Sequence, residues 1–260
     1  MRHAAAAAVL AVVLLSACAP GGGQEDPQPP GDREQAPSAR ENAEPSADPG
    51  AAPEPRRTPG GSAEALELAR AVSAAPGDFG DDFVPQEPYE SDPAQWAVLD
   101  EECVWRREPL PEPVLAALTR HAERPAENPE AGPLQVMSSV TVHDSDRSAD
   151  ARMAGTLEEV LRCPEQRLRP DERVHGLESA GSPGDRERLR ADDHVHEVGL
   201  FVSDTHGGPH PYLWMVSRVG PVTVALSVKG SAEYADQEEL REIAAPVLTR
   251  LQAGIEEALR

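Results

Sequence analysis

The stretch 212-YLWMVSRVGPVTVALSVK-229 is the most informative part of the sequence, because its pattern predicts two strands joined by a tight turn. Apolar side chains alternate through Tyr212–Val219 and again through Val222–Lys229, which is the period of a strand with one buried face. Only Gly220 and Pro221 separate the two runs, so we expect them to pair as a β-hairpin. The other elements are placed outward from this hairpin.

Hydrophobic periodicity predicts further strands and helices on both sides of the hairpin. The expected elements are a helix over Ser62–Ser73, a strand over Leu134–Val142, a helix with an apolar stripe from Met153 to Leu161, a strand over His194–Ser203 and an amphipathic helix over Leu240–Leu259, kinked or divided at Pro246. Pro76–Pro93 is expected to be a loop, and Arg167–Ala191 a long connection with one short strand at Arg173–Leu177. This order predicts an α+β fold, an antiparallel β-sheet with helices packed on one face.

The N-terminus has the pattern of an export signal. Residues 1–17 contain a basic Arg2, an apolar run of Ala4–Leu15 and a small-residue cleavage site. The run ends in Leu15-Ser16-Ala17-Cys18, which resembles the lipobox of bacterial lipoproteins, where the cysteine carries diacylglycerol and a further acyl chain such as palmitate. The alternative is an ordinary secretory signal in which Cys18 has no role. We expect a signal peptide over 1–17 and a lipid anchor on Cys18, at the extracytoplasmic face of the cell membrane.

A Pro- and Gly-rich segment follows the lipobox. Residues 19–62 contain no Val, Ile, Leu, Met, Phe, Tyr or Trp, so they cannot bury enough apolar surface to offset the entropy of ordering. We therefore expect a disordered linker over 18–62, including the lipidated cysteine, and a folded domain over 63–260. The linker would hold the domain away from the membrane.

The net charge is −22, which excludes a surface specialised for nucleic acid, because phosphate binding requires a concentrated basic patch. The same charge disfavours an electrostatic grip on anionic lipid. Acyl chains, rather than basic side chains, are therefore expected to hold the protein on the membrane.

Two cysteines remain once Cys18 is assigned to the lipid. Cys103 and Cys163 form an even pair in an oxidising location, which predicts a disulfide. Such a bridge would join the end of the Met153–Leu161 helix to the segment containing Cys103. A catalytic or redox thiol pair is the alternative, but the C-x-x-C spacing is missing.

Four histidines, His194, His196, His206 and His210, lie in or just after one predicted strand. His194 and His196 share one strand face, so with His206 or His210 they are weak candidates for a zinc site. Strand-end histidines without a metal are the simpler interpretation, and we expect no cofactor. A metal-dependent or Ser/His hydrolase of the cell envelope is the alternative function, although the sequence has no G-x-S-x-G elbow.

The hairpin itself offers a candidate ligand groove. Tyr212, Trp214 and Arg218 alternate onto one face of the first strand, and an arginine beside aromatic rings is typical of a small-molecule cleft. The alternative is that these side chains form core beneath a helix.

The run from Ala151 to Pro164, which ends in Arg-Cys-Pro, and the hairpin Trp214–Val228 resemble the extracellular sensor domain of PknH-type serine/threonine kinases and their actinobacterial lipoprotein relatives. The resemblance spans about residues 97–260. It implies an antiparallel sheet with helices and a groove for an unidentified ligand, although the family typically has two disulfides and this domain has cysteines for one. We therefore expect a cell-surface lipoprotein whose non-catalytic, sensor-like domain binds a small molecule or an envelope protein.

Overall fold

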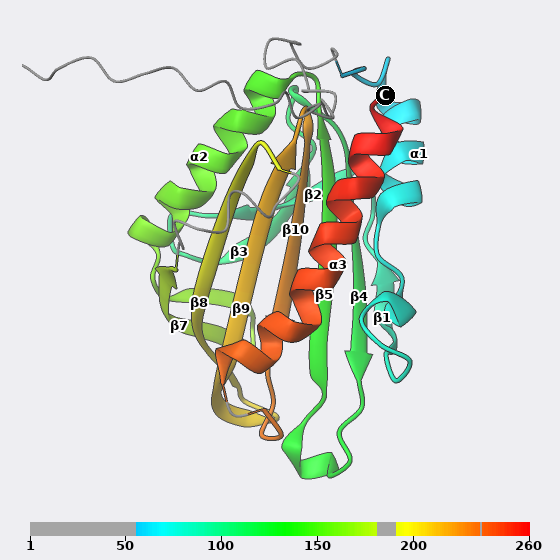
Figure 1. Cartoon of the computed structure of the whole chain (residues 1–260). Helices are drawn as coiled ribbons and strands as arrows, with labels where there is room; N and C mark the ends of the chain where they lie inside the picture. The colour runs from blue at the N-terminus through cyan, green and yellow to red at the C-terminus, as the bar shows by residue number, and fades with distance from the viewer. Residues whose placement is uncertain (1–55, 181–190, 235) are drawn as a thin grey trace, which may run out of the picture. The chain divides into compact units, whose positions relative to one another are not determined.

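The computed structural model describes residues 56–180, 191–234 and 236–260. Within these residues, eight strands form one antiparallel sheet (Figure 1). In spatial order they are β1 (Val84–Glu90), β4 (Val114–Arg124), β5 (Leu134–His143), β10 (Val222–Lys229), β9 (Gly207–Val219), β8 (Asp193–Ser203), β7 (Glu172–Ser179) and β6 (Gln166–Arg169). A separate hairpin consists of β2 (Gln95–Leu99) and β3 (Trp105–Pro109). The helices are α1 (Ser62–Val72), α2 (Asp146–Arg162) and α3 (Gln237–Ala258).

The predicted hairpin is confirmed as the pair β9–β10 at the centre of the sheet. Val219 faces Val222 across the turn, and the pairing continues without a register shift to Tyr212 and Lys229. The α+β class and the antiparallel sheet are therefore confirmed. Alternating apolar side chains were sufficient to place these strands because a one-residue slip would turn the buried face of β10 toward the other side.

One face of the sheet is covered by α1 and α3. The apolar stripe of α3, including Leu240, Leu248 and Ile255, is buried against Val224 and Leu226 of β10 and neighbouring strands. Pro246 lies inside a continuous helix rather than between two helices. This layer is the main core of the domain.

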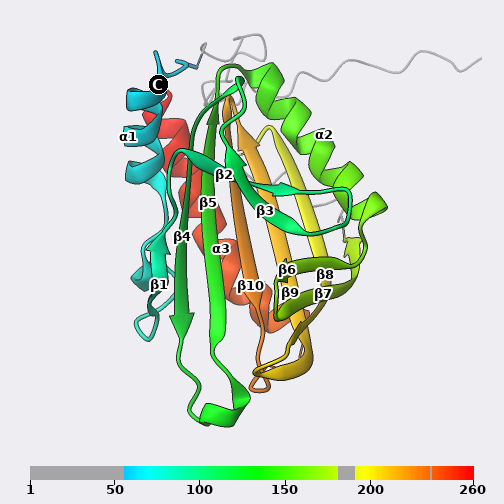
Figure 2. The same ribbon diagram turned by 180° about the vertical axis from the view of Figure 1, so that it is seen from behind.

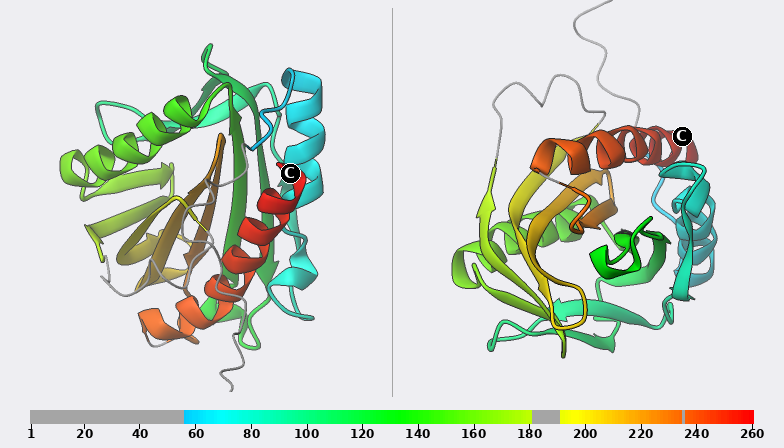
Figure 3. Two further views of the ribbon diagram at one scale, coloured as in Figure 1. Left: turned by 45° about the horizontal axis from the view of Figure 1, so that its top comes forward. Right: turned by 90° about the horizontal axis from the view of Figure 1, so that it is seen from below.

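The opposite face carries α2 and the β2–β3 hairpin (Figure 2, Figure 3). Met153 of α2 is buried with Val195 and Val216, which point away from α3. The sequence prediction placed all helices on one face of the sheet. α2 instead lies on the other face, because the central strands are apolar on both faces. Leu161, expected in the buried stripe, is 85% exposed, whereas Ala149, Met153, Thr156 and Val160 are buried.

Three parts of the sheet differ from the predicted elements. β1 lies in the segment predicted as a loop, and it contains Pro85 and Pro88. Proline is tolerated there because β1 is an edge strand. β4 was missed altogether, since its Ala- and Leu-rich sequence lacks the usual strand residues. The predicted long connection contains a two-strand hairpin, β6–β7.

The folded unit begins before residue 63. Arg56 pairs with Asp192 at 2.5 Å, and the Arg57 amide donates to the carbonyl of Leu259 at 2.8 Å. Cys18, the predicted signal peptide and the linker up to residue 55 lie outside the described residues. Among the helices described, none combines the length and apolar character needed to cross a membrane.

Candidate functional site

A cleft lies between the sheet and the β2–β3 hairpin, on the face that α2 shares. Its volume is about 550 Å³, and a recess of about 100 Å³ shares much of its lining. The sheet contributes Met137, Tyr212 and Trp214, and the hairpin contributes Ala97 and Trp105. This volume falls within the range of small-molecule sites.

All three tryptophans of the chain line the cleft or its recess. The rings of Trp105 and Trp214 lie 6.1 Å apart between centroids in a tilted arrangement. The Trp105 indole donates to the Gln166 amide oxygen at 2.8 Å. The Trp96 ring lies 5.7 Å from the Arg152 guanidinium. Aromatic rings held by polar contacts give the cleft firm apolar walls.

The predicted disulfide is confirmed between Cys103 and Cys163, whose Cα atoms lie 5.6 Å apart. Cys103 lies between β2 and β3, and Cys163 follows the last residue of α2. Arg162 adds hydrogen bonds to the carbonyls of Asp100 and Leu99 at 2.8 and 3.3 Å. The disulfide therefore fastens the hairpin that covers the cleft to α2.

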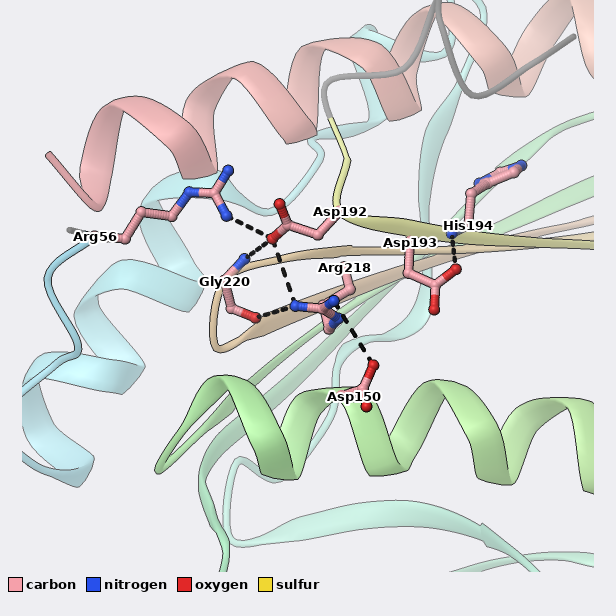
Figure 4. A network of polar contacts seen from close by, with 7 residues as sticks. All are labelled: Arg56, Asp150, Asp192, Asp193, His194, Arg218 and Gly220. Carbon is pink, nitrogen blue, oxygen red and sulfur yellow. Dashed lines mark hydrogen bonds and ion pairs between the residues drawn. The ribbon is translucent and has the colours of Figure 1, made fainter. Parts of the chain in front are cut away.

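The three predicted groove residues do not all lie in the same place in the structure. Trp214 lines the cleft, and Tyr212 lies in its floor at 5% exposure. Arg218 lies instead at the far end of β9, where it contacts Asp192 at 3.5 Å and Asp150 at 3.7 Å (Figure 4). Since each strand residue advances about 3.3 Å, four positions remove Arg218 from Trp214 by about 13 Å.

The four candidate histidines do not converge. His194 and His196 lie on the α3 side of β8, opposite the cleft, whereas His206 packs against Gly132 and His210 contacts the His206 carbonyl at 3.3 Å. In the described ranges, no group of three His, Cys, Asp or Glu side chains is arranged to hold a metal ion. The zinc hypothesis therefore gains no support from the geometry.

One serine does meet a histidine. The Ser217 hydroxyl lies 3.0 Å from His194 Nδ1 and also accepts a hydrogen bond from Gln252 of α3 at 2.8 Å. Ser217 is 0% exposed beneath α3. A nucleophile must reach its substrate, so this chain of hydrogen bonds is structural rather than a hydrolase site.

Sequence reasoning missed the charged part of the cleft. Arg107 of β3, His121 of β4, Arg169 of β6 and Lys229 of β10 line it. Burial, together with the smaller effects of the positive charges of Arg169, Arg107 and Lys229, lowers the pKa of His121 to about 4. His121 is therefore neutral at pH 7. These residues lie on four strands that are not neighbours in the sheet, so only the complete fold brings them together.

Glu197 is a second group that sequence reasoning missed. It lies on β8 across from Trp214 and is 3% exposed. Burial, with a smaller contribution from Glu159, raises its pKa to about 8, although Arg152 acts in the opposite direction. Its Oε1 atom has no hydrogen-bond partner among the described residues. The side chain is therefore an acid held mainly neutral at pH 7.

The solved structures that are similar to this chain include two mycobacterial proteins. The extracellular domain of PknH from Mycobacterium tuberculosis is 13% identical with a TM-score of 0.47, and the match covers 72% of this chain and 96% of that domain. An uncharacterized Rv0999 ortholog from Mycobacterium smegmatis is 12% identical with a TM-score of 0.35, covering 72% and 95%. No family model and no curated protein matches the chain.

Proposed function

We propose that the domain is a non-catalytic, sensor-like binding module outside the cytoplasm, and that its cleft holds a small molecule. The observation that carries this proposal is the cleft of about 550 Å³ walled by Trp105 and Trp214. Most ligand sites combine such apolar walls with a few polar groups. A disulfide-fastened hairpin over the cleft also favours a preformed site over a mobile surface.

Binding is favoured over catalysis by the polar groups of the cleft. His121 is neutral and has no hydrogen bond to a serine, cysteine or carboxylate in the parts of the chain that the structure describes. General acid–base and nucleophilic mechanisms need such a partner within hydrogen-bond reach. The hydrolase alternative has no comparable observation in its favour.

A lipid anchor on Cys18 belongs to the same proposal. The chain carries a lipobox-like sequence, and the disulfide agrees with an oxidising location. Replacing Cys18 with alanine is expected to move the protein from the detergent phase to the aqueous phase in detergent partitioning. Retention of the Cys18→Ala variant in the detergent phase would contradict lipidation at this residue.

Filling the cleft tests the binding proposal. Met137 lies on the sheet floor and lines both the cleft and its recess, so Met137→Trp places extra bulk where a ligand would lie. Using 1-naphthoate and the neutral amide 1-naphthamide as probes, we expect calorimetry to show that the full wild-type chain binds at least one of them. Met137→Trp should weaken that binding at least about tenfold.

The matched control adds the same indole elsewhere. Leu161 on α2 is 85% exposed, so Leu161→Trp should bind both probes as the wild type does. The proposal fails if neither probe binds the wild-type chain at millimolar concentration. It also fails if Met137→Trp, folded by circular dichroism, binds as tightly as the wild type.

A further inference from the structure

A positive region lies inside the cleft of this acidic chain. Arg107, Arg169 and Lys229 line the cleft from three strands. Burial is the main reason that the pKa values of Arg107, His121 and Lys229 are lowered, and the positive charge of Arg169 lowers each of them further. These groups are therefore close enough to repel one another, and an anion placed among them would relieve that repulsion.

The nearest carboxylate does not balance this cluster. Glu172 is 5% exposed, and its Oε2 atom lies 2.5 Å from Lys229 Nζ and 3.7 Å from Arg169 Nε. Asp171 also raises the pKa of Lys229, but less than Glu172 does, so two negative charges face three positive ones. Arg107 is the third positive charge and lies outside this arrangement.

The other charged residues at the cleft are engaged elsewhere. Glu90 pairs with Arg120 at 3.2 Å, and Arg106 pairs with Asp100. Neither pair includes a member of the positive cluster. These two ion pairs therefore do not neutralise the excess positive charge of the cluster.

Within the described residues, the Arg107 guanidinium makes no hydrogen bond or ion pair, and Arg107 remains open to solvent although neighbouring atoms in the cleft partly desolvate it. Asp92, a carboxylate at the rim of the same cleft, instead accepts a hydrogen bond from the backbone amide of Ala94 at 2.9 Å. A guanidinium presents two parallel donors that match a carboxylate or a phosphate. Arg107 is thus available to a ligand.

The apolar surface of the cleft adjoins the positive cluster. Trp105 and Trp214 line the same cavity as Arg107, and Met137 and Leu168 extend the apolar lining. A ligand that satisfied both parts would need a flat or apolar body and an anionic group at one end. Neither part by itself specifies such a molecule.

Resting on the proposed function, we infer that the cleft selects a small organic anion, with its carboxylate or phosphate on Arg107 and its apolar body against Trp105 and Trp214. The cavity of about 550 Å³ suits a molecule of this size. Nucleic acids and anionic membranes are disfavoured as occupants, since the chain has a net charge of −22 and would repel a large polyanion.

Three naphthalene probes of similar shape test this inference. Calorimetric titration of the full chain compares 1-naphthoate, 1-naphthyl phosphate and the neutral 1-naphthamide. At least one anion is expected to bind about tenfold more tightly than the amide, because a charge-assisted hydrogen bond is stronger than a neutral one. The two anionic probes distinguish a carboxylate from a phosphate preference.

Arg107→Gln should remove most of this preference, because it should weaken binding of the anions more than binding of 1-naphthamide. The control is Arg241→Gln, which removes one positive charge from an exposed ion pair on α3. The inference fails if 1-naphthamide binds as tightly as both anions, or if Arg107→Gln keeps the preference. In either case cleft binding, and with it the proposed function, would still stand. If none of the three probes bound the wild-type chain, both the inference and the proposed function would be overturned.

Discussion

Replacing Cys103 and Cys163 with alanine is expected to lower the free energy of unfolding by about 4 kcal/mol, the chain-entropy value for a loop of this size. The disulfide spans a sequence separation of 60 and is the covalent link between the hairpin and α2. Its loss should also weaken 1-naphthoate binding, since Trp105 on β3 would no longer be held over the sheet. Urea unfolding followed by tryptophan emission measures the first effect, and calorimetry measures the second.

The control for this experiment is Cys18→Ala, which removes a thiol without touching the bridge. It should leave the unfolding midpoint unchanged. Equal stability of the bridged chain and the Cys103→Ala/Cys163→Ala chain would show that the hairpin is held in place without the disulfide.

Replacing Glu197 with glutamine is expected to stabilise the domain above neutral pH. The pKa of Glu197 is raised from 4.5 to about 8, so between these values the folded state binds more protons than the unfolded state. Wild-type stability should therefore fall as the pH rises from about 4.5 to about 8 and level off above it. The variant lacks this loss and should be more stable at pH above 8, by an amount on the order of 5 kcal/mol.

Denaturation of both proteins across this pH range measures the effect. Below the lower pKa the two free energies should be close, because the wild-type side chain is then neutral in both states. Glu158→Gln on the exposed side of α2 is the matched control, and it should follow the wild-type curve. If Glu197→Gln lowered stability at every pH, the buried carboxyl group would have to be well satisfied in its ionised form.

The central strands were predictable because their sequence has one consistent period. β5, β8, β9 and β10 each alternate, and the Gly220-Pro221 turn fixes the pairing of the last two. The edge strand β1 was not predictable in this way, since its prolines are acceptable only where one side of the strand is unpaired. Local pattern therefore identified the middle of the sheet better than its margins.

The cleft was predicted only in part, because it is assembled from distant segments. Trp214 was found from the aromatic face of its strand, and the disulfide from the count of cysteines. Arg107, His121 and Arg169 lie on strands that periodicity did not identify. Arg218 was wrongly grouped with Trp214, since a shared strand face does not bring together its two ends.

The most direct test of the central claim is a titration followed by the indole ¹H–¹⁵N signals of the full chain. The chain has three tryptophans, and all of them line the cleft or its recess, so these signals report on that region. With 1-naphthoate and 1-naphthamide as probes, we expect the signals of Trp105 and Trp214 to shift in a saturable manner and Met137→Trp to suppress the shift. Indole signals that stay in place while either probe binds would contradict the account, because the binding site would then lie elsewhere.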